Sequence, residues 1–86
     1  YIDLDLHHGD GVEEEFKMSK HVATFSLHHY AAGFYPNTGG ALLSNSGFSI
    51  NAPLPERVGD NDWLSIAAFG INRIMDAFDP QYVVVQ

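Results

Sequence analysis

The chain opens with the residues Tyr1-Ile2-Asp3-Leu4-Asp5-Leu6-His7-His8, in which apolar and acidic side chains alternate. This alternation predicts a β-strand over Tyr1–Leu6. Successive side chains of an extended chain point to opposite faces, so Asp3, Asp5 and His7 would share one face, with neighbouring Cα atoms ~7 Å apart. Because two such carboxylates repel each other and are costly to bury, a cation or a protonated partner is needed to hold them together, and a metal ion would meet this need. Asp and His are standard zinc ligands, and a catalytic zinc ion takes three protein ligands and leaves one position open.

A second interpretation of the same pattern needs no metal. The strand would lie at the edge of a sheet, its acidic side chains would face water, and its histidines would cap a turn at Gly9-Asp10-Gly11. Alternation alone does not separate the two interpretations, because it is the ordinary pattern of a half-exposed strand.

The rest of the chain supplies further strands and a short helix. Short apolar or β-branched runs predict strands at Val22–Leu27 and Tyr82–Val85. Gly11–Lys17 has three glutamates near its start and predicts a helix. Strands separated by helices form right-handed crossovers and a parallel sheet covered on both faces. The predicted fold class is therefore α/β, with ligands bound beyond the carboxyl ends of the strands.

A longer helix and a long loop complete the predicted elements. Asp60 or Asn61 can cap a helix that ends before Asp79. With Trp63, an apolar stripe of this helix is expected to join the core: Leu64, Ala67, Ile71, Ile74 or Met75, and Phe78. Ala31–Gly47 is rich in glycine, serine and asparagine, which predicts a surface loop of a length that often carries function.

Composition limits the classes to which the chain can belong. Its 86 residues suffice for one small domain, and 45% apolar against 17% charged residues is typical of a globular interior. The chain has no cysteine, so a metal ion must be held by His, Asp, Glu or backbone oxygens. No run is long enough to span a bilayer, and a net charge of −7 disfavours nucleic acid and suits a cationic partner. Both ends fall directly beside predicted strands, so we expect a fragment of a larger domain.

Several stretches of the chain resemble class I histone deacetylases. They stand in the family's order and cover nearly the whole chain: Asp3–Glu13 (Asp-Leu-Asp-Leu-His-His-Gly-Asp-Gly-Val-Glu), Val22–His28, Gly33–Gly39, Asn51–Leu54 and Val83–Gln86. The resemblance implies the three-layer parallel-sheet fold of the arginase and deacetylase superfamily. Residues 1–86 would then be a partial catalytic domain whose N-terminal and C-terminal parts are missing.

The same resemblance implies a zinc site that this segment supplies in part. Asp5 and His7 match two zinc ligands, while the third ligand, a catalytic histidine pair and a catalytic tyrosine are expected outside these residues. Asp3 and Asp10 match aspartates that orient the two catalytic histidines. From the residues alone, Asp10 is equally well explained as a turn residue between two glycines. The fragment by itself is expected to be inactive.

Class I deacetylases also hold monovalent cations, and the resemblance implies potassium. The nearer ion would be bound by the Asp3 side chain, the Ser26 hydroxyl, the Leu27 carbonyl and backbone oxygens of Asp3, Asp5 and His7. A second ion would use backbone carbonyls at Phe16, Ser19, Val22 and Phe48.

Phe34 and Tyr35 fall where the family lines a tunnel for the acyl-lysine chain, with the ring at Tyr35 forming one wall. The alternative is that both are loop anchors buried against the sheet. The family usually has phenylalanine at Tyr35 and glycine at Asn37, which predicts a more polar wall here. The histidines His21, His28 and His29 are interpreted as structural.

The activity implied by the resemblance is zinc-dependent hydrolysis of N-acetyl-lysine in histone tails, by a chromatin regulator of the nucleus that represses transcription, with the cytoplasm as a second compartment. Expected partners are acetylated histone tails and corepressor proteins, without direct binding of nucleic acid or membrane. One alternative is an acetylpolyamine or other small-molecule amidohydrolase of the same fold, against which Val12-Glu13 and Leu27-His28 argue. The other is a catalytically dead scaffold, against which Asp5 and His7 argue.

Overall fold

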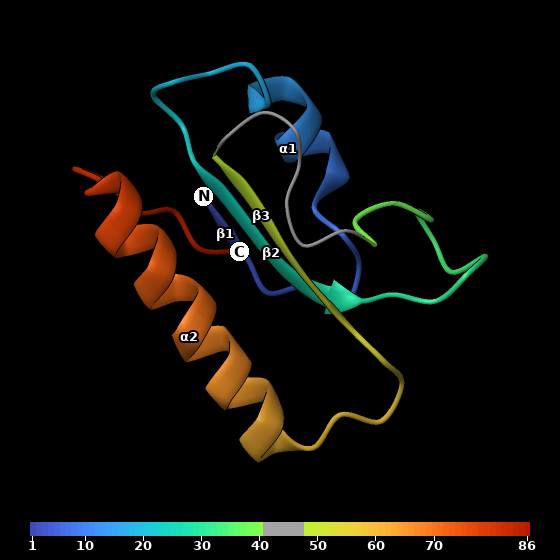
Figure 1. Ribbon diagram of the computed structural model, residues 1–86. Helices are drawn as coiled ribbons and strands as arrows, with labels where there is room; N and C mark the ends of the chain where they lie inside the picture. The colour runs from blue at the N-terminus through green and yellow to red at the C-terminus, as the bar shows by residue number, and fades with distance from the viewer. Residues whose placement is uncertain (41–47) are drawn as a thin grey trace.

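The computed structural model describes residues 1–40 and 48–86, and it places three strands between two helices (Figure 1). In chain order the elements are β1 (Ile2–Asp3), α1 (Asp10–Phe16), β2 (Thr24–His29), β3 (Ser49–Leu54) and α2 (Asp60–Phe78). The strands are parallel and lie in the order β1-β2-β3. Figure 1 shows α1 and α2 on opposite sides of the sheet. The α/β class and the parallel sheet covered on both faces are therefore confirmed for this fragment.

The two faces of β2 are both buried but differ in polarity. Phe25 faces α2, because its ring lies against Gly70 of that helix, and Leu27 shares this face. The core on this side consists mainly of apolar side chains: Ile2, Ala23, Phe25, Leu27, Leu54, Ala67 and Ile74. Ser26 and His28 point to the opposite face, toward α1, and Asn51 of β3 is in register with Ser26. The sheet thus has an apolar face under α2 and a buried polar face under α1.

The first strand is much shorter than predicted, so the expectation of a strand over Tyr1–Leu6 is wrong beyond Asp3. Asp3 Oδ1 accepts the backbone N–H of Asp5 at 3.1 Å, and Asp5 Oδ2 accepts that of His7 at 3.3 Å. Such side-chain bonds to the backbone two residues ahead form Asx turns, which compete with strand pairing. The alternating residues therefore lie in a bent segment that leaves the sheet at its carboxyl edge.

Two further strand predictions are correct in part. The second strand starts and ends two residues later than predicted, at Thr24 and His29. The predicted strand Tyr82–Val85 is reduced to one parallel bridge between Ile2 and Val85, although residues 84–86 exchange backbone hydrogen bonds with Ile2 and Leu4. This segment extends the sheet beyond β1 without forming a full strand.

Strand β3 was not predicted at all. Its sequence Ser-Ile-Asn-Ala-Pro-Leu alternates polar and apolar residues but contains Pro53, which argues against a strand because proline cannot donate a backbone hydrogen bond. The register nevertheless pairs all six residues of β3 with β2. As the outer member of the three described strands, β3 needs its N–H groups only on the β2 side, which accommodates the proline.

Both predicted helices are present. The shorter one runs from Asp10 to Phe16 and the longer one from Asp60 to Phe78. Gly59, rather than Asp60 or Asn61, occupies the N-cap of α2, and no side chain caps it. Leu64 is exposed, contrary to the predicted stripe, whereas Ala67, Gly70 and Ile74 are the buried positions and Trp63, Ile71 and Phe78 are partly buried against the core.

Helix α2 ends at a left-handed residue. Asp79 has φ 49° and donates its N–H to the Met75 carbonyl, and Pro80 follows. Within the described ranges 1–40 and 48–86, neither helix combines the length and the apolar character that crossing a membrane requires. The predicted loop Ala31–Gly47 has no helix or strand over residues 31–40, and its residues 41–47 lie outside the described part.

We predict that Gly70→Ala destabilises the protein, although alanine favours a helix interior by about 1 kcal/mol. A Cβ at this position would collide with the ring of Phe25, which is buried and cannot turn away. Overpacking of this kind costs roughly 1 to 3 kcal/mol. Urea unfolding of the full-length gene product measures the effect. In a Phe25→Leu background the same change should be neutral or stabilising, and equal destabilisation in both backgrounds would contradict the contact.

Candidate metal and substrate site

Asp5 and His7 lie side by side where the chain leaves β1. His7 Nδ1 is 3.4 Å from Asp5 Oδ2, and about half of each side chain is exposed, 42% for His7 and 56% for Asp5. A carboxylate oxygen and an imidazole nitrogen at this separation can bind one ion together. The two predicted ligands are thus brought together by the Asx turns, since the strand pairing that was predicted to do so ends at Asp3.

The carboxyl group of Asp5 is held in its ionised form. The backbone N–H of His7 is the main cause, followed by that of Leu6, and together they lower the pKa of this carboxyl group. Only the ionised form is a good metal ligand. Asp5 therefore meets the protonation requirement of a ligand without any help from a metal.

Two aromatic rings surround the imidazole of His7. The ring of Phe34 stacks on it at a centroid distance of 5.3 Å and an interplanar angle of 10°. The ring of Tyr35 meets it edge-on at 5.6 Å and 77°. Phe34 also packs edge-on against His29 and is partly buried, as expected for a loop anchor, whereas Tyr35 is 73% exposed and is no such anchor. Of these two rings, Tyr35 is the more accessible one beside the candidate ligands.

A cavity of about 540 Å³ lies at the carboxyl ends of the strands. Asp5 and Phe34 line it, as do Leu27, Leu54 and Trp63. Open parallel sheets bind ligands beyond the carboxyl ends of their strands, and the candidate residues occupy this edge.

Asp3 is buried beneath the segment that carries Asp5 and His7. Besides accepting the N–H of Asp5, its carboxylate is 3.1 Å from the Tyr1 hydroxyl. A Cβ on Gly9 would collide with this carboxylate, so only glycine permits the turn to approach. Asp10, the other predicted orienting residue, is exposed in the first turn of α1. The structure therefore places Asp3 below the candidate ligands and Asp10 at the surface beside them.

The residues predicted for the nearer potassium ion gather around the same turn. Ser26 is the register neighbour of Asp3, and its hydroxyl oxygen accepts the N–H of Gly9 at 3.1 Å. The side chain of Leu27 is buried on the α2 side, so this residue could contribute only through its backbone. Asp3 and Ser26 are thus side by side, and the potassium site itself stays a prediction.

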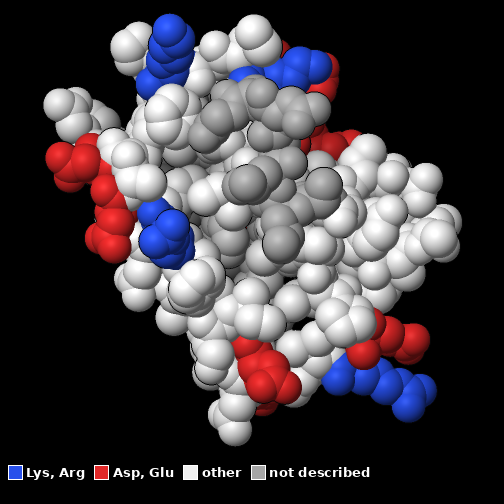
Figure 2. All heavy atoms as spheres, in the orientation of Figure 1, with Lys and Arg blue, Asp and Glu red and all other residues white. Residues whose placement is uncertain are grey.

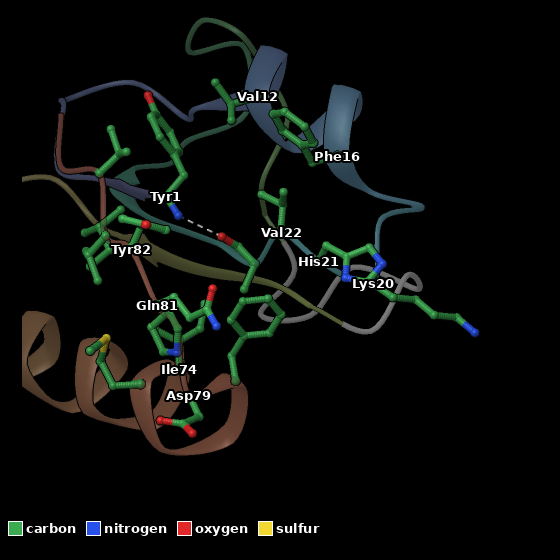
Figure 3. A pocket seen from close by; sticks show the side chains of 17 residues that line it. Tyr1, Val12, Phe16, Lys20, His21, Val22, Ile74, Asp79, Gln81 and Tyr82 are labelled. Atoms are coloured by element: carbon green, nitrogen blue, oxygen red, sulfur yellow. Dashed lines mark hydrogen bonds between the residues drawn. The ribbon is translucent and has the colours of Figure 1, made fainter.

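The residues predicted for the second potassium ion lie at the opposite end of the strands. The carbonyls of Phe16 and Phe48 already accept backbone N–H groups from Ser19 and Thr24. Phe16 and Val22 line a cavity of about 720 Å³ between α1 and the end of α2, with Ile74 on its far side (Figure 3). This larger cavity is separate from the candidate metal ligands.

A buried pair of histidines was missed by the sequence analysis as a functional element. The rings of His8 and His28 are 4.6 Å apart beneath the candidate site. His28 Nε2 donates to the Gly39 carbonyl at 3.1 Å, so its Nδ1 accepts from the Ser26 hydroxyl at 2.9 Å. Burial lowers the pKa of His28, with a smaller contribution from the neighbouring His8, which keeps the ring neutral. The alternation of Thr24, Ser26 and His28 with apolar residues was the available signal.

Charged side chains do not gather into a basic patch on the face drawn in Figure 2. Lysine and arginine appear there as separate side chains, and most of this face is uncharged. The full sequence has 4 basic against 11 acidic residues. This balance gives a polyanion no strong electrostatic attraction to this segment.

The described residues contain no cluster of three or more His, Cys, Asp or Glu side chains arranged for one metal ion, so the segment offers the pair Asp5 and His7. In comparisons with known proteins, the profile of the histone deacetylase domain matches residues 1–86. This chain belongs to the histone deacetylase family. The resemblance inferred from the motifs is therefore confirmed.

Known family members match this deacetylase segment over its whole length. Histone deacetylase 8 of Xenopus laevis is 39% identical over 90 residues, which cover 100% of this chain and 28% of that protein. Histone deacetylase B of Dictyostelium discoideum is 38% identical over 91 residues, or 100% and 21% of the two chains. Histone deacetylase HOS1 of Saccharomyces cerevisiae is 38% identical over 87 residues, or 100% and 18%. The chain thus spans between 18% and 28% of the length of these relatives.

Asn37 has a structural explanation in this deacetylase segment. It adopts φ 65°, a left-handed conformation that glycine and asparagine tolerate best, and its side-chain oxygen accepts the N–H of Gly33 at 2.9 Å. This bond closes the loop upon itself. The expectation that Asn37 makes the tunnel wall more polar stays a prediction. Tyr35, whose ring contacts His7, is exposed and carries a polar hydroxyl group.

We predict that Gly39→Ala destabilises the protein much more than Gly33→Ala. Both glycines have positive φ, 77° and 82°, so both substitutions carry similar backbone strain. Only at Gly39 would the new Cβ lie 2.6 Å from both buried imidazoles, while Gly33 has open space. The extra overpacking is expected to cost about 1 to 3 kcal/mol. Thermal unfolding of the two full-length variants tests this, and equal melting temperatures would contradict it.

Proposed function

We propose that the protein containing this segment is a zinc-dependent hydrolase that removes acetyl groups from lysine side chains of histone tails. The observation that carries the proposal is the pairing of Asp5 and His7 at 3.4 Å, on the carboxyl edge of the sheet and directly beside Phe34 and Tyr35. Membership of the histone deacetylase family supports the same conclusion.

The donor groups fit a zinc ion. Asp5 offers a carboxylate whose pKa is lowered by backbone N–H groups, and His7 offers an imidazole nitrogen on the same side. A bound zinc ion supplies Lewis acidity, which polarises an amide carbonyl and acidifies a water molecule. Asp5 and His7 are the ligands that this chain contributes, and a third is expected from elsewhere in the protein.

The surrounding residues would orient the reacting groups and the substrate. Asp3 and Asp10 are proposed to accept hydrogen bonds from two catalytic histidines, which fixes the tautomer of each ring and raises its basicity. The rings of Phe34 and Tyr35 are proposed to contact the methylene groups of the acyl-lysine chain. Aromatic rings suit this task because they offer a large apolar surface with little conformational freedom.

Potassium is proposed as a second cation. Asp3 and Ser26 are register neighbours and both contact the Gly9 turn, so a charged and a neutral oxygen ligand are available together with backbone oxygens. Such hard oxygen ligands suit alkali cations better than zinc. A cation here would offset the cost of burying the Asp3 carboxylate.

The biological setting is part of the proposal. Removing acetyl groups restores positive charge to histone tails, which strengthens their attraction to DNA phosphates and represses transcription. We therefore propose a nuclear chromatin regulator, also present in the cytoplasm, that acts with corepressor proteins. The net charge of −7 suits a basic peptide substrate rather than nucleic acid. Assaying an acetylated histone peptide beside acetylspermidine tests the substrate class, and a preference for the polyamine would contradict it.

We predict that Asp5→Ala or His7→Ala in the full-length gene product abolishes deacetylation and lowers the zinc content in parallel. Each change removes one of three expected ligands, which weakens both retention of the metal and acidification of the attacking water. Elemental analysis gives zinc per protein, and hydrolysis of an acetyl-lysine peptide gives the rate.

The exposed acidic residue Asp76 of α2 provides a matched control, because Asp76→Ala removes the same group far from the site and should change neither quantity. Circular dichroism separates loss of a ligand from unfolding. A folded Asp5→Ala variant with full zinc and an unchanged rate would remove this residue from the metal site.

We predict a different result for Asp3→Asn: zinc remains nearly stoichiometric, while activity falls about 10- to 100-fold. The amide oxygen can still accept the N–H of Asp5, and the amide nitrogen can donate to the Tyr1 hydroxyl, so shape and hydrogen bonds persist. Only the negative charge is lost. Zinc analysis beside Asp5→Asn provides the comparison, and an equal loss of zinc in both variants would show that Asp3 is itself a ligand.

A further inference from the structure

His8 follows the candidate ligand His7 but points away from it into the protein. Its side chain is 4% exposed, and both ring nitrogens have partners. Nε2 lies 2.8 Å from Glu13 Oε2 of α1, and it carries a proton because an ionised carboxylate can only accept. Nδ1 lies 2.7 Å from the Thr38 hydroxyl. The ring therefore links a helix to a loop that is 30 residues away in sequence.

The link to α1 is firmly held. Asn51 of β3 donates from Nδ2 to the same carboxylate oxygen, at 2.9 Å. Glu13 is thus anchored by the sheet on one side and by His8 on the other. Hydrogen bonds to charged groups in buried positions are among the stronger ones in proteins. The hydrogen bond from His8 Nε2 to Glu13 therefore holds the imidazole ring in place against α1.

The hydrogen bonds from the histidine pair reach the loop at Thr38 and Gly39, after Tyr35 in the chain. Thr38 is bonded to His8, and the neighbouring Gly39 carbonyl accepts from His28. Gly39 has no space for a Cβ because the two imidazoles lie directly against it. Thr38 and Gly39 are therefore attached by hydrogen bonds to the buried pair His8 and His28.

Tyr35 lies three residues before this anchor and has little burial of its own. Its ring is 73% exposed and contacts the edge of the His7 imidazole. The stretch between Gly33 and Asn37 is closed by local hydrogen bonds, from Gly33 N–H to Asn37 Oδ1 and from Asn37 N–H to the Phe34 carbonyl. These bonds give the stretch a defined local conformation, so its placement over His7 depends on the points where it is attached to the rest of the protein.

We propose that His8 is a positioning residue for substrate binding. Through the Thr38 hydroxyl, His8 holds residues 33–39, called here the Tyr35 loop, over the candidate metal ligands Asp5 and His7. This inference rests on the proposed function, because it assigns the loop to the acyl-lysine side chain. His7 and His8 are consecutive, so one turn of backbone fixes both the metal ligand and the wall beside it. In this proposal His8 acts through Thr38 and does not itself contact the substrate.

A loop that grips the lysine methylenes contacts the substrate equally in the ground state and the transition state. Loss of such uniform binding raises KM and leaves kcat unchanged. A defect in the metal site would instead lower kcat and the zinc content. The split between KM and kcat therefore separates positioning of the loop from damage to the metal centre.

The test compares Thr38→Val with Thr38→Ser in the full-length, zinc-loaded protein, with an acetylated histone peptide as substrate. Valine keeps the shape of threonine and lacks the hydroxyl, whereas serine keeps the hydroxyl. We expect Thr38→Val to raise KM roughly threefold to tenfold, as for loss of one hydrogen bond, with kcat and zinc content unchanged. Thr38→Ser should retain the wild-type KM.

A double-mutant cycle identifies His8 as the partner. His8→Gln places an amide near Nε2, within reach of Glu13, but offers nothing to Thr38. Combined with Thr38→Val it should raise KM no further than His8→Gln alone. Additive effects, an unchanged KM in Thr38→Val, or a fall in kcat or zinc with KM unchanged would each overturn the proposal.

Hydrogen exchange separates failure of this inference from failure of the proposed function. Thr38→Val should accelerate exchange of the amides at residues 33–40 severalfold and leave those of α2 unchanged. If the wild-type protein does not hydrolyse the peptide, the proposed function fails and the role in substrate binding fails with it. The rate of hydrogen exchange at residues 33–40 then still tests whether His8 holds the loop. An unchanged rate in Thr38→Val would overturn this structural role too.

Discussion

The structure depends on how polar side chains are buried on one face of the sheet. Thr24, Ser26 and His28 alternate with Phe25 and Leu27 along a strand that is covered on both sides. A buried polar group without a partner costs roughly 1 to 3 kcal/mol, so each one constrains whatever packs above it. The Gly9 turn, the first turns of α1 and the end of the Tyr35 loop all contribute donors or acceptors to this face. Hydrogen bonds on this polar face, rather than apolar packing, therefore hold the segments next to the candidate site in place.

The sequence predicted the elements with regular apolar spacing and failed where side chains bond to nearby backbone. Helix α2 was located within a residue because its stripe is long, although the exposed Leu64 was assigned to it. The first strand was drawn too long because Asp3 and Asp5 accept backbone N–H groups, which alternation alone does not reveal. Strand β3 was missed because Pro53 is tolerated only at an outer strand, and that placement is a tertiary property.

The sequence named the residues of the candidate site, whose roles stay predictions, but it did not give their geometry. The motif predicted that Asp5 and His7 lie together, and the structure shows them as neighbours. The prediction argued this from an extended strand, whereas a bent backbone joins the two residues. The alternation in β2 marks His28 as one of its polar positions, but the sequence does not show that His8 and His28 pair, since their hydrogen-bond partners Thr38 and Gly39 lie in distant parts of the chain. Asn37 was interpreted by its polarity, whereas its role follows from a backbone angle that only coordinates reveal.

The two Asx turns between Asp3 and His7 also have a consequence for the entropy of ion binding at the proposed metal site. Fixing the backbone of one residue costs about 1 to 2 kcal/mol, and a flexible chelating loop would lose this free energy each time an ion bound. Here the carboxylate oxygens of Asp3 and Asp5 hold the backbone before any ion arrives. Asp5 Oδ2 accepts the N–H of His7, and about half of the Asp5 side chain remains exposed. For the proposed metal site, the segment would thus act as a preorganised chelator, and binding an ion would require little further ordering of its backbone.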